Sequence, residues 1–216
     1  MNTKNTKTEK ITFSAMMIAI AVCLAALCAP IPFLNLPFGG GFTIASMLPI
    51  IVVAYMYGVR WGMLTGFIYS LAQMLLGFNT VSAFFLPGDD QMIWYRAILV
   101  CLIDYVIAYT VLGLGGIFRK KLGKTGALCL GSIVALSVRY IAHIVSGAIF
   151  FGAWAEWFFT QEGFPAFGTK ILEHFSGTGL SLIYSVIYNG TYMIPEIIIT
   201  AIAAIAISRL SQIKVQ

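Results

Sequence analysis

Long apolar stretches separated by short polar segments recur along the whole length of this 216-residue chain. A membrane-spanning helix needs about 20 consecutive apolar residues, and six stretches approach that length. The pattern predicts an all-α integral membrane protein, in which residues 1–216 form a single transmembrane domain. The six predicted membrane-spanning helices lie at about 11–29, 43–58, 61–77, 94–118, 126–151 and 179–207.

The polar segments between these helices alternate in charge. One set is basic and contains Lys4, Lys7, Lys10, Arg60, Arg119, Lys120, Lys121, Lys124, Arg209 and Lys214. The other set, the segments 30–42, 78–93 and 152–178, has a single lysine, Lys170, beside Asp89, Asp90, Glu156, Glu162 and Glu173. Basic loops of membrane proteins face the cytoplasm. The alternation therefore predicts that both termini are cytoplasmic and that the acidic loops face outward.

Composition narrows the class of function. The chain is 60% hydrophobic and 10% charged, whereas a soluble domain has roughly 25% charged residues. Its net charge of +5 is spread over the ends of apolar segments, which does not indicate nucleic-acid binding. The sequence has no HExxH, GxSxG or P-loop motif and no histidine–cysteine metal pattern. We therefore expect no enzyme, no cofactor and no metal site, and a transporter of this sequence would have to be secondary or to borrow an ATPase.

Five polar residues interrupt the last three predicted helices, namely Asp104, Arg139, His143, Asn189 and Glu196. An ionisable group inside a bilayer is costly unless it is paired or lines a cavity. At about 1.5 Å per residue, Asp104, His143 and Asn189 lie at a similar depth, ~8–15 Å below the outer surface, and Tyr184 joins them. Three helices thus offer polar groups in one layer, which predicts a binding site there.

Structural explanations for the same residues remain open. Asp104 and Arg139 could form an ion pair between two helices, and His143 could serve as a hydrogen bond between helices. Glu196 follows Pro195 and is best explained as a partner for backbone groups freed by a proline kink. The i, i+4, i+8 stripe Tyr184, Tyr188 and Tyr192 is by itself typical of packing.

The predicted outer loops are rich in aromatic residues. Loop 30–42 reads PIPFLNLPFGGGF, and loop 152–178 is long and contains Trp154, Trp157, Phe158, Phe159, Phe164 and Phe167. Such loops suit a lid over an outward-facing pocket. An aromatic belt at the membrane interface explains the composition equally well.

Three stretches carry a resemblance to a known family: LIDYVIAYTVLGLGGIFRKK, RYIAHIVSGAIFFGAW and LIYSVIYNGTYMIPE. Together they resemble the thiamin-specific substrate-binding (S) component of energy-coupling factor (ECF) vitamin transporters. The resemblance implies six helices, a thiamin site near the outer face of a bacterial cell membrane, and assembly with a transmembrane coupling protein and two cytoplasmic ATPases.

The resemblance also implies roles for individual residues. Ala15 and Ala19 match the alanine motif that docks onto the coupling protein. A stacking tryptophan of the family falls on Phe151 here, so Trp154 or Trp157 could supply that ring. The residues expected to bind substrate are Asp104, Tyr105, His143, Phe151, Trp154, Tyr184 and Asn189.

The chemistry of thiamin agrees with this set. Its thiazolium ring carries a permanent positive charge, which favours one carboxylate and aromatic faces, and its aminopyrimidine needs a few hydrogen-bonding groups. Two other hypotheses stay open. One is a stand-alone secondary carrier with Asp104, His143 and Glu196 as a proton relay. The other is a membrane scaffold whose polar residues only hold helices together.

Overall fold

The computed structural model describes residues 7–36, 40–88, 91–161 and 165–215. The sequence predictions that involve Lys4, Phe164 and the acidic residues Asp89, Asp90 and Glu162 lie outside these ranges. Within them the chain is helical, apart from loops and one isolated bridge between Asn35 and Gly41. The main helices are α1 (Lys7–Cys28), α2 (Leu48–Tyr57), α3 (Val59–Leu76), α4 (Phe78–Ala83), α5 (Trp94–Val100), α7 (Lys124–Phe150), α8 (Ala155–Phe159), α9 (Pro165–His174) and α10 (Gly177–Ile207).

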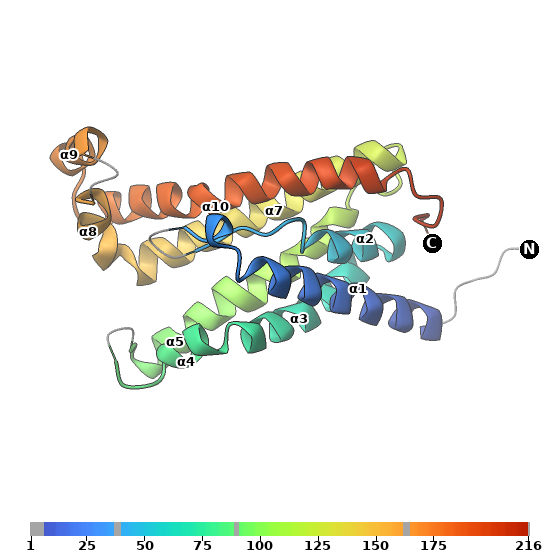
Figure 1. Cartoon of the computed structure of the whole chain (residues 1–216), viewed down its shortest axis with the longest axis horizontal. Helices are drawn as coiled ribbons and strands as arrows, with labels where there is room; N and C mark the ends of the chain where they lie inside the picture. Colours follow the sequence, from blue (N-terminus) through green and yellow to red (C-terminus); the bar gives the residue numbers. More distant parts are fainter. Residues whose placement is uncertain (1–6, 37–39, 89–90, 162–164, 216) are drawn as a thin grey trace, which may run out of the picture.

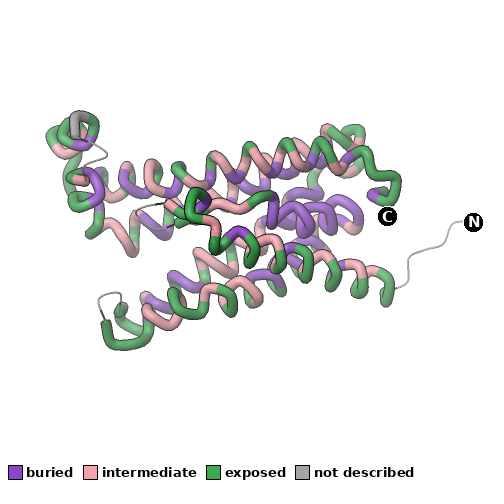
Figure 2. Tube along the Cα trace, in the orientation of Figure 1, coloured by how far each residue is buried: buried purple, intermediate pink, exposed green. Residues whose placement is uncertain are grey.

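The long helices lie roughly parallel to one axis of the molecule (Figure 1). α7 and α10 are antiparallel neighbours along most of their length, and α1, α3 and α5 lie on the other side of the bundle. α2 is buried among them from Leu48 to Met56 (Figure 2). Both ends of the chain lie at one end of the bundle, whereas α8 and α9 lie at the opposite end.

Glycines allow very close packing in the half of the bundle that carries the termini. A Cβ added to Gly62 would lie 2.4 Å from the Cβ of Ala54, and one added to Gly131 would lie 2.2 Å from the carbonyl oxygen of Gly115. Small residues let helix backbones approach in this way. In this half, α2, α3, α7 and the 3₁₀ segment Val111–Gly116 therefore pack closely against one another.

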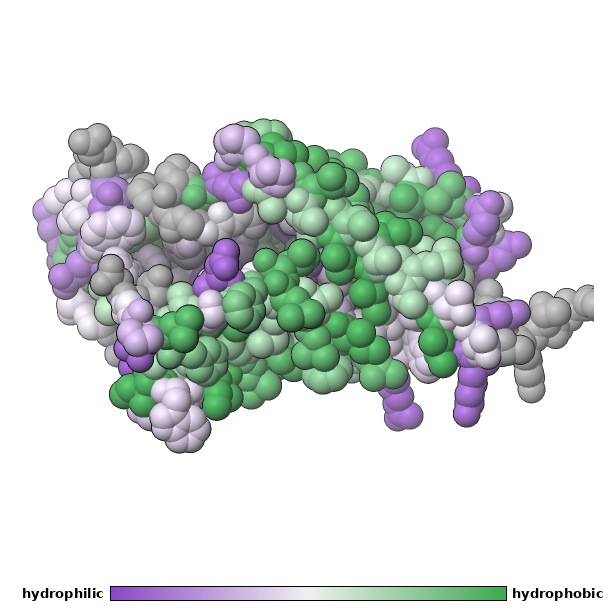
Figure 3. All heavy atoms as spheres, turned by 60° about the horizontal axis from the view of Figure 1, so that its bottom comes forward, coloured by the Kyte–Doolittle hydropathy of each residue, from purple (hydrophilic) through white to green (hydrophobic). Residues whose placement is uncertain are grey.

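Several helices match the lengths expected for a bilayer. Among the described residues, four helical stretches are long and apolar enough to cross a membrane: Lys7–Cys28, Trp94–Gly116, Lys124–Phe150 and Gly177–Ile207. α2 is apolar but has only 10 residues, since the helix begins at Leu48 rather than near residue 43. α3 has 18 residues. On the face shown in Figure 3, a broad hydrophobic surface covers the middle of the bundle, and hydrophilic side chains gather at the end that carries the termini.

The stretch Trp94–Gly116 is not a regular α-helix. After α5 the chain forms a π-helical segment, Cys101–Ile107, then one α turn and the 3₁₀ segment. π-helical turns inside helices occur frequently at functional sites. The π-helical segment contains Asp104 and Tyr105 and turns both toward the interior of the bundle.

Candidate ligand-binding site

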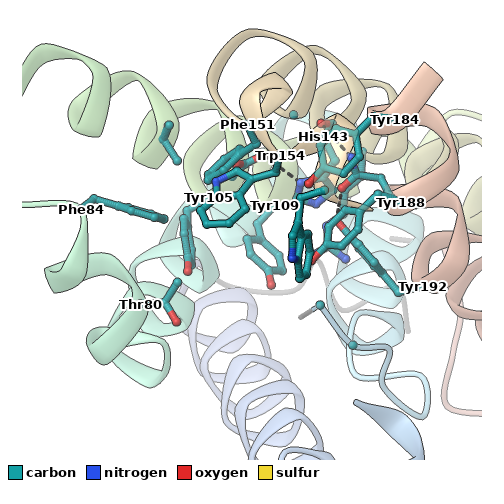
Figure 4. Close-up of a pocket in the computed structure, with 18 residues that line it drawn as sticks. Thr80, Phe84, Tyr105, Tyr109, His143, Phe151, Trp154, Tyr184, Tyr188 and Tyr192 are labelled. Atoms are coloured by element: carbon teal, nitrogen blue, oxygen red, sulfur yellow. Dashed lines mark hydrogen bonds and ion pairs between the residues drawn. The ribbon is translucent and has the colours of Figure 1, made fainter. Parts of the chain in front are cut away.

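A pocket of about 720 Å³ lies in the half of the bundle opposite the termini. Its walls come from the π-helical segment, α7, α8, α10 and the segment before α2 (Figure 4). Ligand pockets of proteins commonly have volumes of 300–1,000 Å³. The pocket is therefore large enough for a small organic molecule.

All seven residues expected from the sequence to bind substrate line this single pocket. They are Asp104, Tyr105, His143, Phe151, Trp154, Tyr184 and Asn189. They come from three separate helical stretches and from the short 3₁₀ turn after α7. The structure thus brings together side chains that lie up to 85 positions apart in the sequence (104 to 189).

The carboxylate of Asp104 is held by two side chains of α7. Nδ1 of His143 lies 2.9 Å from Oδ1, and the hydroxyl of Ser146 donates to Oδ2 at 2.8 Å. Because a carboxylate accepts hydrogen bonds, Nδ1 of His143 carries the proton in this pair. The side chain of Asp104 is 19% exposed, so it is oriented by protein groups and still accessible from the pocket.

Asn189 connects α10 to α7 beside this carboxylate. Its side-chain amide donates to the carbonyl oxygen of Ser185 at 2.8 Å and to that of His143 at 3.3 Å. The hydroxyl of Tyr192 donates to its Oδ1. Ser185 adds a bond from its hydroxyl to the carbonyl oxygen of Ile144 at 2.8 Å. The polar side of the pocket is consequently a connected network across two helices.

Aromatic rings form the remaining walls. Tyr184 and Tyr188 stack with their centroids 5.5 Å apart, and Tyr192 continues the row along α10 (Figure 4). Trp154 and Trp157 form an edge-to-face pair with centroids 5.7 Å apart, and both are exposed. The tyrosine stripe therefore lines the pocket as well as packing against α8.

Arg139 is not the partner of Asp104. Its guanidinium lies 4.5 Å from the centroid of Tyr109, and Nη1 lies 2.7 Å from the sulfur of Met47. In the described part of the chain no carboxylate forms an ion pair with it. The ion pair between Asp104 and Arg139 that the sequence left open is absent there, and the two carboxylate oxygens accept hydrogen bonds from His143 and Ser146 instead.

Glu196 has a different partner from the one expected of a residue after a helix proline. Its buried carboxylate accepts a hydrogen bond from the backbone N–H of Thr43 at 2.6 Å and bonds from the hydroxyl of Thr43 at 3.0 Å. The expectation that it satisfies backbone groups freed by Pro195 is wrong, since Thr43 lies 153 positions away in the sequence.

The pocket also contains residues that sequence reasoning did not assign to it. Thr80 and Phe84 come from the segment after α3, Tyr109 follows the π-helical segment, and Gly40 and Gly41 precede α2. Tyr188 and Tyr192 could have been added from their i, i+4 spacing with Tyr184. The loop residues give no such signal, because their positions depend on how distant segments fold back.

Ala15 and Ala19 lie away from the pocket, on the exposed face of α1. Both side chains are exposed, in a helix whose other face packs against α2 and α3. In the described residues no cluster of three or more His, Cys, Asp or Glu side chains could hold a metal ion.

Comparison with known proteins identifies the family of the chain. Residues 11–157 match the family described as thiamine transporter protein (Thia_YuaJ). The chain is 31% identical over 198 residues to the thiamine transporter ThiT of Bacillus subtilis (strain 168), which covers 87% of this chain and 84% of that protein.

A solved structure of ThiT from Listeria monocytogenes has the same fold. Its TM-score is 0.63 at 20% sequence identity, and the match covers 96% of this chain and 97% of that one. The helices long enough to cross a membrane fit such a transporter. The chain therefore belongs to the thiamine transporter family, whose members are membrane transporters and not enzymes.

Proposed function

We propose that this protein is the substrate-binding component that captures thiamin from outside the cell for import by an ATP-driven ECF complex. The observation that carries the proposal is the accessible carboxylate of Asp104, held by His143 and Ser146 in a pocket walled by aromatic rings. A partly exposed carboxylate faced by aromatic rings suits an organic cation with a flat ring.

The two rings of thiamin can use different parts of the pocket. The cationic thiazolium is expected to lie between Asp104 and the tyrosine row of α10, where ion pairing and cation–π contact both favour it. The aminopyrimidine has donors and acceptors on its edge, which suit Asn189, His143 and Tyr105. Phe151, Trp154 and Tyr184 are expected to stack against the rings.

Import then requires partners. The sequence has no P-loop, so ATP hydrolysis would come from two cytoplasmic ATPases through a transmembrane coupling protein. The exposed Ala15 and Ala19 offer a flat helix face for close contact with that coupling protein. We infer six spans with both termini cytoplasmic, in the cell membrane of a bacterium, which would direct the pocket outward.

A stand-alone proton-coupled carrier is the competing function. It would use Asp104, His143 and Glu196 as a relay. Among the described residues, Glu196 forms hydrogen bonds with Thr43 and Thr200, and none joins it to Asp104 or His143. The described contacts therefore favour a binding component over a relay.

Two measurements separate the possibilities. Calorimetric titration of the purified chain with thiamin should give saturable binding without ATP. Liposomes that contain this chain alone should not accumulate thiamin when a pH gradient is imposed. Accumulation driven by the gradient would contradict the proposal in favour of the secondary carrier, and absence of binding would contradict both.

A further inference from the structure

One wall of the pocket is made by a segment that turns back on itself between α1 and α2. The N–H of Leu36 donates to the carbonyl oxygen of Gly40 at 3.0 Å, and the N–H of Phe42 donates to that of Leu34 at 3.0 Å. Asn35 and Gly41 form the isolated bridge between them. We refer to residues 34–36 and 40–42 as the wall segment.

The wall segment fits closely against α10. Gly40 has φ of +74°, and a Cβ built on it would lie 3.0 Å from Cδ1 of Tyr192. Gly40 and Gly41 both line the pocket, and the same Cβ on Gly40 would lie 3.5 Å from the hydroxyl oxygen of Tyr188. A small shift of this segment would therefore change the width of the pocket at Tyr188 and Tyr192.

Three consecutive backbone amides hold the end of the wall segment, and each donates to a different element. Phe42 donates within the segment, Thr43 donates to the carboxylate of Glu196 on α10 at 2.6 Å, and Ile44 donates to the sulfur of Cys28 on α1 at 3.3 Å. The bond to Glu196 is the shortest of the three.

Glu196 lies on the same helix as the tyrosine row of the pocket. Glu196 is 2% exposed and lies one turn after Tyr192, on the same face of α10 as Tyr188. α1 packs against α2 and α3, while α10 packs mainly against α7. The contacts of Thr43 with Glu196 therefore link the segment that follows α1 directly to the helix that carries the tyrosine row.

We infer that Glu196 is a positioning residue that tethers the wall segment to α10 through Thr43, and that this tether slows the escape of a bound ligand. The retention of ligand rests on the proposed thiamin function, whereas the tether itself does not. Glu196 lies beyond the ligand-facing tyrosines and is not among the residues that line the pocket. It acts through the segment that it holds.

Hydrogen exchange of the purified full-length chain tests the tether without any ligand. In Glu196→Ala, exchange of the amides of Phe42, Thr43 and Ile44 should accelerate by roughly 3- to 100-fold, the range expected for the loss of one hydrogen bond. Exchange in the middle of α7 should not change. Glu196→Gln keeps one acceptor for the N–H of Thr43, so its acceleration should be smaller.

Two further variants guard against a general loss of stability. Thr43→Val removes only the hydroxyl, which bonds to Glu196 and to Ser46, and should accelerate exchange of the same three amides to a smaller extent. Ser132→Ala removes a buried hydrogen bond to the carbonyl oxygen of Leu128 in α7, and should leave those amides unchanged. Equal exchange at residues 42–44 in wild type, Glu196→Ala and Thr43→Val would overturn the tether.

Ligand retention is measured separately, from the rate constant of thiamin dissociation. We expect this rate constant to rise several-fold or more in Glu196→Ala, with a smaller change in the association rate constant. Accelerated exchange at residues 42–44 with an unchanged dissociation rate would overturn the retention. Accelerated exchange in a chain whose wild type binds no thiamin would support the tether and overturn the proposed function instead.

Discussion

Nδ1 of His143 on α7 lies 2.9 Å from Oδ1 of Asp104 in the π-helical segment, so the acid of the pocket is oriented by a neighbouring helix. Ser146, one turn further along α7, holds the other oxygen at 2.8 Å. A ligand cation would therefore meet a carboxylate that has already lost its rotational freedom, which lowers the entropic cost of binding.

The bond from Ser146 provides a test of this orientation. Ser146 does not line the pocket, so Ser146→Ala changes the support of Asp104 and no ligand contact. A hydrogen bond to a charged group is worth about 1.5–3 kcal/mol, and binding loses only the part of it that orients Asp104 for the ligand. We expect thiamin affinity, measured by calorimetry, to fall by about 2- to 10-fold, and unchanged affinity would show that Ser146 does not position the acid.

The tyrosine row should contribute through its ring faces. Tyr188→Leu removes a ring that stacks on Tyr184, and cation–π contact is worth about 0.5–2 kcal/mol. We expect a loss of about 2- to 30-fold in thiamin affinity. Tyr188→Phe keeps the ring and is the matched control, with affinity close to wild type. Equal losses in both variants would assign the effect to the hydroxyl instead.

α7 packs closely against α10 beside the pocket, so a second substitution should partly reverse the effect of replacing Gly147 by alanine. A Cβ at Gly147 would lie 2.2 Å from the hydroxyl oxygen of Ser185 and 3.0 Å from Nδ2 of Asn189. Gly147→Ala should therefore lower both the melting temperature and thiamin affinity. Adding Ser185→Ala removes the hydroxyl oxygen that would clash with the new Cβ, and should restore part of the melting temperature and part of the affinity. A double variant no better than Gly147→Ala would contradict this geometry.

Two glycines of α7 should differ sharply when replaced by alanine. At Gly131 a Cβ would lie 2.2 Å from the carbonyl oxygen of Gly115, whereas at Gly126 its nearest neighbour would be the Cβ of Leu122 at 3.8 Å. Overpacking of a tight contact costs about 1–3 kcal/mol. Thermal unfolding in detergent should show clear destabilisation for Gly131→Ala and a neutral or stabilising effect for Gly126→Ala. Similar melting temperatures would mean that the helices separate more easily than the packing implies.

The sequence predicted the helical fold and the layer of polar residues for simple reasons. Hydropathy marks long helices directly, and a rise of about 1.5 Å per residue converts position into depth. That conversion grouped Asp104, His143, Tyr184 and Asn189, and all four line one pocket. The number of spans and their orientation stay predictions.

The partners of the charged residues could not be predicted in the same way. Depth alone left an ion pair between Asp104 and Arg139 open, because the rotation of each helix about its axis was unknown. The π-helical segment sets that rotation for Asp104. The contact between Glu196 and Thr43 depends on a loop that folds back across the bundle. The sequence near either residue does not predict this contact.

Tryptophan fluorescence during a titration of the purified chain with thiamin tests most directly the claim that Asp104 and the aromatic walls bind a cation. Trp154 and Trp157 line the pocket and are each 46% exposed, so a bound ligand should alter their emission. We expect saturable quenching at submicromolar thiamin in the wild type, and none at these concentrations in Asp104→Asn. No response from a folded wild type, or an equal response from Asp104→Asn, would contradict the claim.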